Sequence, residues 1–182
     1  HEFKEHIKTA NLLYGLTDTL ANSAKICINC LKNGGKILIF GNGGSAADAQ
    51  HFAAELVGRY KTSRKGLAAI ALTTDTSVLT SISNDFSYRH VFERQVEALA
   101  NKDDVVIGIS TSGKSDNVIS ALKLASTLNC NTIGFSGHDG GEMNKICSIN
   151  LVVPSNDTPR IQEMHVIFGH TICHLIDQEF RS

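Results

Sequence analysis

The sequence lacks both a surplus of one charge and any long apolar run. Its 17 basic and 18 acidic side chains nearly cancel and form no dense run of lysine and arginine, so no strong electrostatic field favours nucleic acid. No apolar stretch approaches the roughly 18 residues that a membrane-spanning helix needs, and the start shows no signal-peptide pattern. We therefore expect a cytoplasmic protein with no nucleic acid and no membrane among its partners.

Cysteine is too scarce for a disulfide framework. The five cysteines are odd in number, scattered and mostly inside apolar segments: Cys27, Cys30, Cys130, Cys147 and Cys173. That distribution predicts reduced thiols in a core. Cys27 and Cys30 form a C-x-x-C pair, but it lies in an amphipathic helical pattern with no second pair. It therefore predicts packing rather than a redox or zinc centre.

The apolar pattern predicts one α/β domain spanning residues 1–182. Apolar residues at steps of three and four predict a helix over 13–31 that ends at Asn33-Gly34-Gly35. Beyond it, short apolar runs predict strands at 37–40, 68–72, 105–109, 132–135 and 151–153. Helical patterns predict helices over 45–59, 76–83, 89–99, 115–128 and 160–180. Strands buried on both faces and alternating with helices indicate a five-stranded parallel sheet in a three-layer α/β/α sandwich.

Two loops follow predicted strands and precede predicted helices, where ligands of such sheets bind. The first, Gly41-Asn42-Gly43-Gly44-Ser45, is rich in glycine, so a ligand can approach its backbone and the free N–H groups of the next helix. The second, Ser110-Thr111-Ser112-Gly113-Lys114-Ser115, offers hydroxyl and N–H groups that suit a phosphate monoester.

The second loop also matches a nucleotide-binding pattern. Residues 108–115 spell G-x-x-x-x-G-K-S, the pattern of a P-loop nucleotide-binding protein. Three observations disfavour that alternative: Gly108 falls inside the predicted strand, the loop is rich in hydroxyls rather than glycine, and no later strand ends convincingly in a magnesium-binding Asp.

Two predicted helices carry candidate metal ligands. His51 and Glu55 are spaced i and i+4, which places them on one helix face, although solvated pairs with this spacing are at least as common. The last helix carries Gln162, Glu163, His165, His170 and His174. Gln162 and His170 lie about 80° apart around a helix axis, but Glu163 with His170, or His170 with His174, would fit as well. The spacing leaves this choice open.

Five segments in order carry a family resemblance over nearly the whole chain: GNGGSAADAQHFAAEL (41–56), SNDF (83–86), GISTSGKSDNV (108–118), HDGGEM (138–143) and TPRIQEMH (158–165). Together they resemble the phosphoheptose isomerase family, the sedoheptulose-7-phosphate isomerases with the sugar isomerase (SIS) domain. The resemblance implies a flavodoxin-like SIS fold and a homotetramer with active sites between subunits. The long first and last helices would lie at the oligomer interface.

The resemblance also implies roles for single residues. Sugar contacts match Asn42, Gly43, Gly44, Ser45, Asn84 and Asp85, and the phosphate cradle matches Ser110, Thr111, Ser112 and Ser115. One zinc per active site would be held by His51, Glu55, Gln162 and His170, with Glu55 and Gln162 also at the substrate. Some family members carry an Asp directly before the R-I-Q triplet, where this chain has Pro159. The contribution of that Asp must be absent or supplied elsewhere.

The implied reaction converts sedoheptulose 7-phosphate to D-glycero-D-manno-heptose 7-phosphate through an enediol(ate), the first step of bacterial ADP- or GDP-heptose biosynthesis. Glu55 and His170 are the candidate proton carriers, because a carboxylate and an imidazole both suit proton shuttling. The alternative is a non-catalytic SIS regulator of the type that associates with the DnaA initiator. The presence of Glu55 and His170 favours the enzyme over that scaffold.

Overall fold

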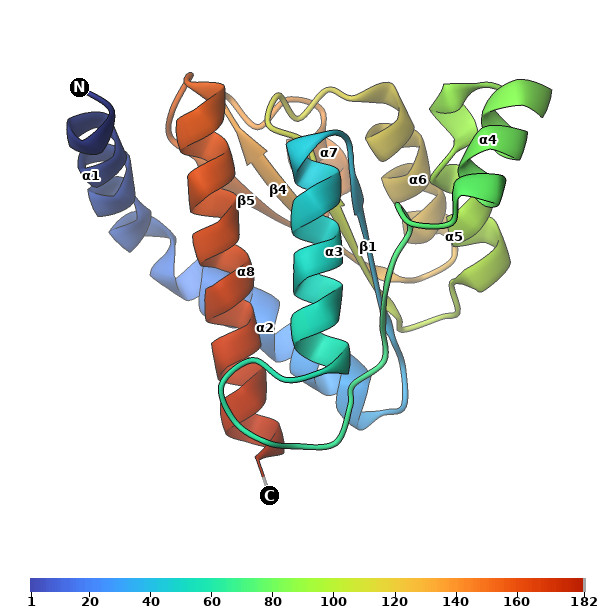
Figure 1. Ribbon diagram of the computed structural model, residues 1–182, viewed down its shortest axis with the longest axis horizontal. Helices are drawn as coiled ribbons and strands as arrows, with labels where there is room; N and C mark the ends of the chain where they lie inside the picture. Colours follow the sequence, from blue (N-terminus) through green and yellow to red (C-terminus); the bar gives the residue numbers. More distant parts are fainter. Residues whose placement is uncertain (182) are drawn as a thin grey trace.

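The computed structural model describes residues 1–181 and places a parallel sheet between two layers of helices (Figure 1). In chain order the elements are α1 (Glu2–Leu12), the 3₁₀ turn η1 (Leu13–Leu16), α2 (Thr17–Lys32), β1 (Ile37–Gly41), α3 (Gly44–Val57), β2 (Ala69–Ala71), α4 (Thr76–Asp85), the 3₁₀ turn η2 (Tyr88–His90), α5 (Glu93–Leu99), β3 (Val105–Ile109), α6 (Asp116–Thr127), β4 (Asn131–Gly137), α7 (Met143–Ile146), β5 (Ile149–Val153) and α8 (Thr158–Phe180).

The five strands lie in the order β2-β1-β3-β4-β5, and every pairing is parallel. This is the flavodoxin-like order, so the predicted fold is confirmed. The chain turns to one side of β1 to form β2 and to the other side to form β3. The carboxyl ends of β1 and β3 therefore border the point where the strand order reverses, which is where such sheets bind ligands.

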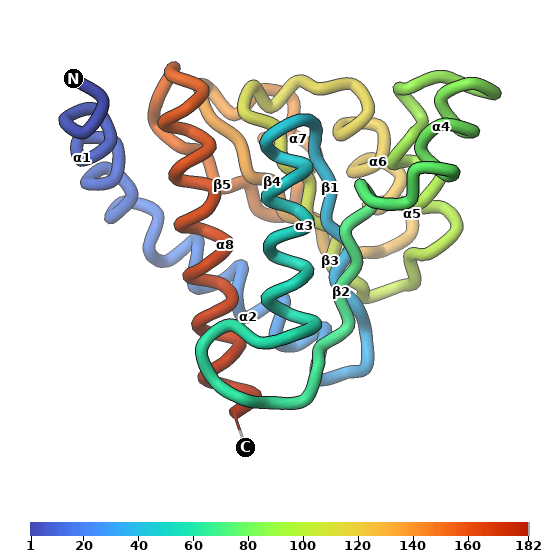
Figure 2. Tube along the Cα trace, viewed as in Figure 1, coloured from blue at the N-terminus to red at the C-terminus, as the bar shows by residue number. Residues whose placement is uncertain are grey.

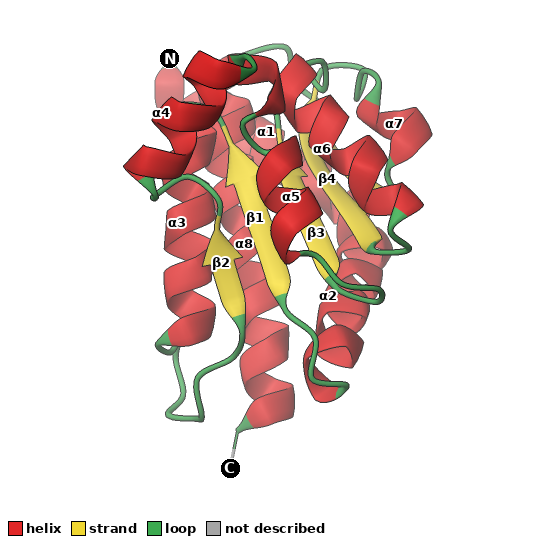
Figure 3. Ribbon diagram, turned by 90° about the vertical axis from the view of Figure 1, so that its right-hand side faces the viewer, coloured by secondary structure: helices red, strands yellow, loops and turns green. Residues whose placement is uncertain are grey.

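Alternate residues of each strand enter two separate cores. In β1, Ile37 and Ile39 pack with α2, α3 and α8, whereas Leu38 and Phe40 pack on the opposite face, where α5 and α6 lie. Figure 3 shows the sheet between these two layers. The alternation follows from the two-residue period of a strand. Within the described chain, no helix combines the length and the apolar character needed to cross a bilayer.

The predicted helix over 13–31 is interrupted. Residues Leu13–Leu16 form a 3₁₀ turn, α2 starts only at Thr17, and a further helix, α1, precedes the turn. Gly15 lies in this turn, and glycine costs about 1 kcal/mol relative to alanine inside an α-helix. The chain therefore changes direction here, as the trace in Figure 2 shows.

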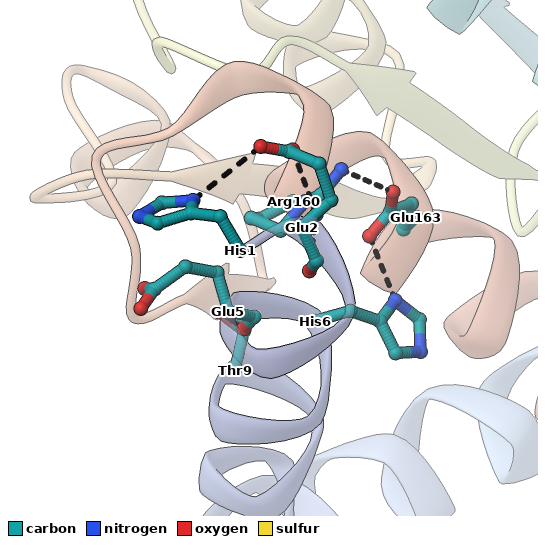
Figure 4. A network of polar contacts seen from close by, with 7 residues as sticks. All are labelled: His1, Glu2, Glu5, His6, Thr9, Arg160 and Glu163. Atoms are coloured by element: carbon teal, nitrogen blue, oxygen red, sulfur yellow. Dashed lines mark hydrogen bonds and ion pairs between the residues drawn. The ribbon is translucent and has the colours of Figure 1, made fainter.

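Helix α1 is held to α8 by polar contacts (Figure 4). The Arg160 guanidinium donates to the Glu2 carbonyl at 2.7 Å and lies 2.7 Å from the Glu163 carboxylate. The other oxygen of Glu163 lies 2.7 Å from His6 Nδ1. Arg160 thus joins the start of α1 to the first turns of α8.

All five cysteines are free. Cys27 and Cys30 lie in the core beside Cys173 of α8. Burial raises the pKa of the Cys173 thiol to about 12, so this thiol is protonated and unreactive at neutral pH. The C-x-x-C pair packs in the core, as the sequence predicted.

Candidate active site

The two ligand-binding loops predicted from sequence begin side by side. β1 ends at Gly41 and β3 at Ile109, and these residues are register partners in neighbouring strands. A Cβ on Gly41 would lie 2.8 Å from the Ile109 carbonyl oxygen and 2.7 Å from Ser45 Cβ. Glycine at this position therefore allows the start of α3 to pack closely over the strand ends.

The first loop is shaped by Gly43 and fixed by Asn42. Gly43 has a φ of +56°, a backbone conformation that suits glycine, and α3 begins at the next residue. Asn42 and Asn117 exchange two side-chain hydrogen bonds of 2.9 Å, and the Tyr88 hydroxyl donates to Asn42 Oδ1 at 3.0 Å. No sequence pattern pointed to Asn117 or Tyr88, although Asn117 falls within the segment 108–118 that carries the resemblance.

The second loop gathers hydroxyl groups at the start of α6. Ser110 Oγ lies 2.9 Å from Ser115 Oγ and 3.4 Å from Ser112 Oγ. Thr111, the residue between Ser110 and Ser112, is half-buried. These groups lie where α6 presents unpaired N–H groups, so the arrangement can bind a phosphate. Gly108 lies inside β3, as predicted, which removes the first glycine of the P-loop pattern from the loop.

A second turn, residues 138–142, supports the loop over 110–115, which we name the phosphate loop after its predicted role. The Gly113 carbonyl accepts a hydrogen bond from the Glu142 N–H at 3.0 Å, and Gly113 packs directly on Gly140. The ammonium of Lys114 lies 3.7 Å from the Asp139 carboxylate in the same turn. The segment HDGGEM therefore acts as the base on which the phosphate loop rests.

The structure brings together three of the four predicted metal ligands. His51 Nε2 lies 3.2 Å from Glu55 Oε1, one turn along α3, and 3.4 Å from His170 Nε2 on α8. One ligand atom from each residue lies within 4.8 Å of the other two. Figure 1 shows α3 and α8 running side by side, which is why residues so distant in sequence meet.

The surroundings favour the neutral form of His170. Burial is the main cause that lowers its pKa below the ordinary value, and the nearby His51 acts in the same direction. Lys61 lowers the pKa further, whereas Glu55 opposes the shift. A neutral imidazole can accept a proton or bind a metal ion at pH 7.

The three side chains fit a zinc ion. Two nitrogens and one carboxylate oxygen are a typical zinc donor set. With zinc–nitrogen distances of about 2.0–2.1 Å, two nitrogens of a tetrahedral site lie roughly 3.4 Å apart. The 3.4 Å between the His51 and His170 Nε2 atoms and the 3.2 Å between His51 and Glu55 have this spacing.

The fourth predicted ligand, Gln162, contacts the first loop. A Cβ on Gly44 would lie 2.7 Å from Gln162 Nε2, so the Gln162 side chain packs against the start of α3. His51 lies seven residues further along α3, about 10 Å at 1.5 Å per residue. Gln162 thus lies at the start of α3, beside the loop over 41–45, and its role as a metal ligand stays a prediction.

Asn84 and Asp85 lie at the end of α4, exposed to solvent. The Asn84 amide donates to the Asp85 carboxylate at 2.8 Å. Within the described part of the chain, neither the Asn84 nor the Asp85 side chain forms a hydrogen bond to the loops over 41–45 and 110–115. Tyr88, three residues later, provides the contact from this region to Asn42.

Comparisons with known proteins identify the family of the chain. The family model described as SIS domain matches residues 7–137. The phosphoheptose isomerase of Aliarcobacter butzleri is 65% identical over 179 residues, which cover 98% of this chain and 95% of that protein. The solved phosphoheptose isomerases of Neisseria gonorrhoeae and Francisella tularensis are 46% and 37% identical, with TM-scores of 0.93 and 0.94. Each alignment covers 97% of this chain and 95% of the other. The chain therefore belongs to the phosphoheptose isomerase family of SIS-domain enzymes.

Proposed function

We propose that this protein isomerises sedoheptulose 7-phosphate to D-glycero-D-manno-heptose 7-phosphate. The observation that carries the proposal is the convergence of His51 and Glu55 of α3 with His170 of α8, on a helix α3 whose start adjoins the phosphate loop. An open-chain heptose phosphate has its phosphate and its carbonyl group at opposite ends. A site with an anion-binding loop beside the start of α3, and with proton-transfer groups further along that helix, suits such a substrate.

The phosphate end of the substrate would be held by Ser110, Thr111, Ser112 and Ser115 together with the N–H groups of α6. The middle of the sugar would contact Asn42 and the glycine-rich backbone of residues 43–45. Gln162, which packs on Gly44, would contact the substrate from α8. The family resemblance makes Asn84 and Asp85 further proposed sugar contacts.

At the carbonyl end, Glu55 and His170 are the proposed proton carriers. A base removes a proton from C1 of the open-chain ketose, and the electron pair forms an enediolate between C1 and C2. A proton then returns to C2, while the hydroxyl proton moves from O1 to O2. The lowered pKa of His170 keeps its imidazole available to accept a proton at neutral pH.

We propose one zinc ion per site, held by His51, Glu55 and His170, with Gln162 as the remaining predicted ligand. When bound, zinc would supply a Lewis acid for negative charge on the sugar oxygens. Coordination would also restrain Glu55 and His170, so an organising role for the metal is the second possibility.

The remaining proposals concern the assembly and its setting. We propose a single SIS domain over 1–182 and a homotetramer with active sites between subunits. The five free thiols favour a reducing compartment, and we propose the cytoplasm. The product would enter ADP- or GDP-heptose biosynthesis.

The decisive experiment is turnover of sedoheptulose 7-phosphate by the purified protein without nucleotide. We expect Glu55→Gln and His170→Gln to lose at least about 10²–10⁴-fold in kcat, the range for a missing general acid or base. Glu97→Gln is the matched control, because Glu97 is exposed and pairs with Arg94. Wild-type rates in both site variants would refute the assignment, and capture of an initiator protein without turnover would favour the scaffold.

A further inference from the structure

The loop between α3 and β2, residues 58–68, is longer than the roughly 2–6 residues usual for helix-to-strand connections. In Figures 1 and 2 it leaves the end of α3, passes across the last turns of α8 and only then returns to the sheet. A direct connection to β2 would not need this path. The longer path brings the loop into contact with α8, through Lys61, Thr62 and Arg64.

A buried ion pair fixes the loop to α8. The Arg64 side chain is fully buried and donates from Nε to Asp177 Oδ1 at 2.7 Å, and the Asp177 side chain is 2% exposed. The other oxygen of Asp177 accepts hydrogen bonds from the Lys61 and Thr62 N–H groups at 2.7 and 2.9 Å. Burial alone would raise the pKa of Asp177, but these donors together hold it below its ordinary value.

The same guanidinium fixes the end of α3. Arg64 donates to the Glu55 carbonyl at 2.8 Å and to the Leu56 carbonyl at 2.9 Å. Both carbonyls lie in the last turn of α3, where helix carbonyls lack partners within the helix. Arg64 thus links the backbone of a proposed catalytic residue, Glu55, to Asp177 on α8.

This arrangement places the Tyr60 ring beside the catalytic imidazole. The Tyr60 and His170 ring centroids are 5.3 Å apart with planes inclined by 30°, and the His174 ring lies 6.4 Å from Tyr60. His170 also has the His51 ring as an edge-on neighbour at 5.0 Å. An imidazole has a broad, weakly restricted χ2 torsion, so neighbouring rings determine where its nitrogens point.

We propose that Tyr60 is a positioning residue for the isomerase reaction. Its ring holds the His170 imidazole with Nε2 toward His51 and Glu55, and the Arg64–Asp177 pair holds Tyr60 in place. The inference rests on the proposed function, because Tyr60 acts through His170. The ring face, rather than the phenol hydroxyl, performs this role.

The test compares Tyr60→Ala, Tyr60→Phe and Ser63→Ala, an exposed residue of the same loop. We expect Tyr60→Ala to lower kcat about 10-fold or more and to weaken zinc binding, measured by competition with a chelating dye, by about 10–100-fold. KM for sedoheptulose 7-phosphate should change less than about twofold, because Tyr60 lies outside the two loops over 41–45 and 110–115. Tyr60→Phe and Ser63→Ala should match the wild type in both measurements.

Each other outcome has a defined meaning. Unchanged kcat and zinc affinity in Tyr60→Ala would overturn the inference, as would a rise in KM alone, which would indicate a substrate contact. If the wild type does not turn over the sugar, the proposed function fails, whereas the zinc titration still tests Tyr60. If Tyr60→Ala does not fold, Tyr60→Leu retains apolar volume without a flat ring and should show the same losses.

Discussion

At the scale of single residues, Gly113 determines how the phosphate loop rests on the turn over 138–142. Its φ is +64°, and a Cβ there would lie 2.2 Å from the Gly140 carbonyl oxygen. The neighbour is backbone, so it cannot move aside as a flexible side chain would. The phosphate loop is therefore sensitive to a single methyl group at this position.

We expect Gly113→Ala to lower the free energy of unfolding by about 2–4 kcal/mol, from the left-handed backbone and the collision together. KM for the sugar phosphate should rise as the loop shifts. Gly34→Ala is the control, because Gly34 has a φ of +79° with no atom within 4 Å of the added Cβ. Strain alone should cost that variant about 1–2 kcal/mol. Urea titration measures the free energy of unfolding, and steady-state kinetics measure KM. Equal losses of unfolding free energy in the two variants would show that the contact with Gly140 adds no cost.

His165 makes stability depend on pH. Its Nε2–H donates to the Ser136 carbonyl at 3.0 Å, but burial dominates and lowers the pKa to about 4. Between about pH 6.5 and 4, the unfolded chain binds a proton that folded His165 does not. The stability from this residue is therefore complete above pH 6.5 and falls by up to about 1.4 kcal/mol per unit on acidification.

We expect urea titrations at pH 7, 6 and 5 to show this decline in the wild type. His165→Gln, which does not titrate, should decline less steeply over the same range. The comparison is between slopes, so a lower overall stability of the variant does not affect it. Parallel slopes would show that His165 takes up its proton over the same pH range in the folded and the unfolded chain, so that its pKa is not lowered by folding.

At the scale of elements, α8 connects the site to the rest of the fold. It carries Gln162 and His170 toward α3, and Asp177 two turns later toward the loop over 58–68. Removing one partner of a buried ion pair leaves the other charge buried without compensation, which costs about 3–5 kcal/mol. The Arg64–Asp177 pair is of this kind.

Asp177→Ala should therefore lose about 3–5 kcal/mol of unfolding free energy. Glu179→Ala is the control on the same helix, because Glu179 forms an exposed ion pair with Lys32. Exposed pairs contribute about 0–1 kcal/mol. Chemical denaturation distinguishes the two, and a loss below about 1 kcal/mol in Asp177→Ala would show that the pair is replaceable.

Local patterns explain which elements could be predicted. Apolar runs identified all five strands, and glycine or hydroxyl residues after them identified both loops, because each pattern acts over neighbouring residues. Contacts between distant elements left no such pattern: the Asn42–Asn117 pair, the Tyr60–His170 contact and the position of Gln162 depend on how α3, α6 and α8 pack. The break at Gly15 was missed because leucines continue the helical spacing through it.

At the scale of the whole molecule, an apolar groove runs between the N-terminal helices and α8. Its cavity is about 470 Å³, and side chains from α1, η1, α2 and α8 line it, including Leu13, Leu20 and Leu175. Tyr14, which also lines the groove, is 81% exposed. An apolar surface of this kind suits burial against another subunit, in line with the proposed tetramer.

We expect Tyr14→Glu to dissociate the assembly into smaller species, since a buried charge in a subunit contact is costly. The fold of each subunit should persist, because Tyr14 is exposed within it. Phe86→Glu, at an exposed residue elsewhere, is the comparison. Light scattering after gel filtration measures the mass of the assembly. If only Phe86→Glu dissociates it, the subunit contact lies at the surface near α4 and not at the apolar groove.

The position of β1 inside the sheet has a consequence for biosynthesis. β1 lies near the start of the chain, but its partner strand β3 comes much later. In the parallel pairing, Ile37 of β1 lies opposite Val105 of β3, and Gly41 lies opposite Ile109. Until the ribosome has released that later segment, one edge of β1 keeps unpaired backbone groups and exposed apolar side chains. A nascent chain stalled before β3 should consequently recruit chaperones, whereas one stalled after β5 and α8 should not.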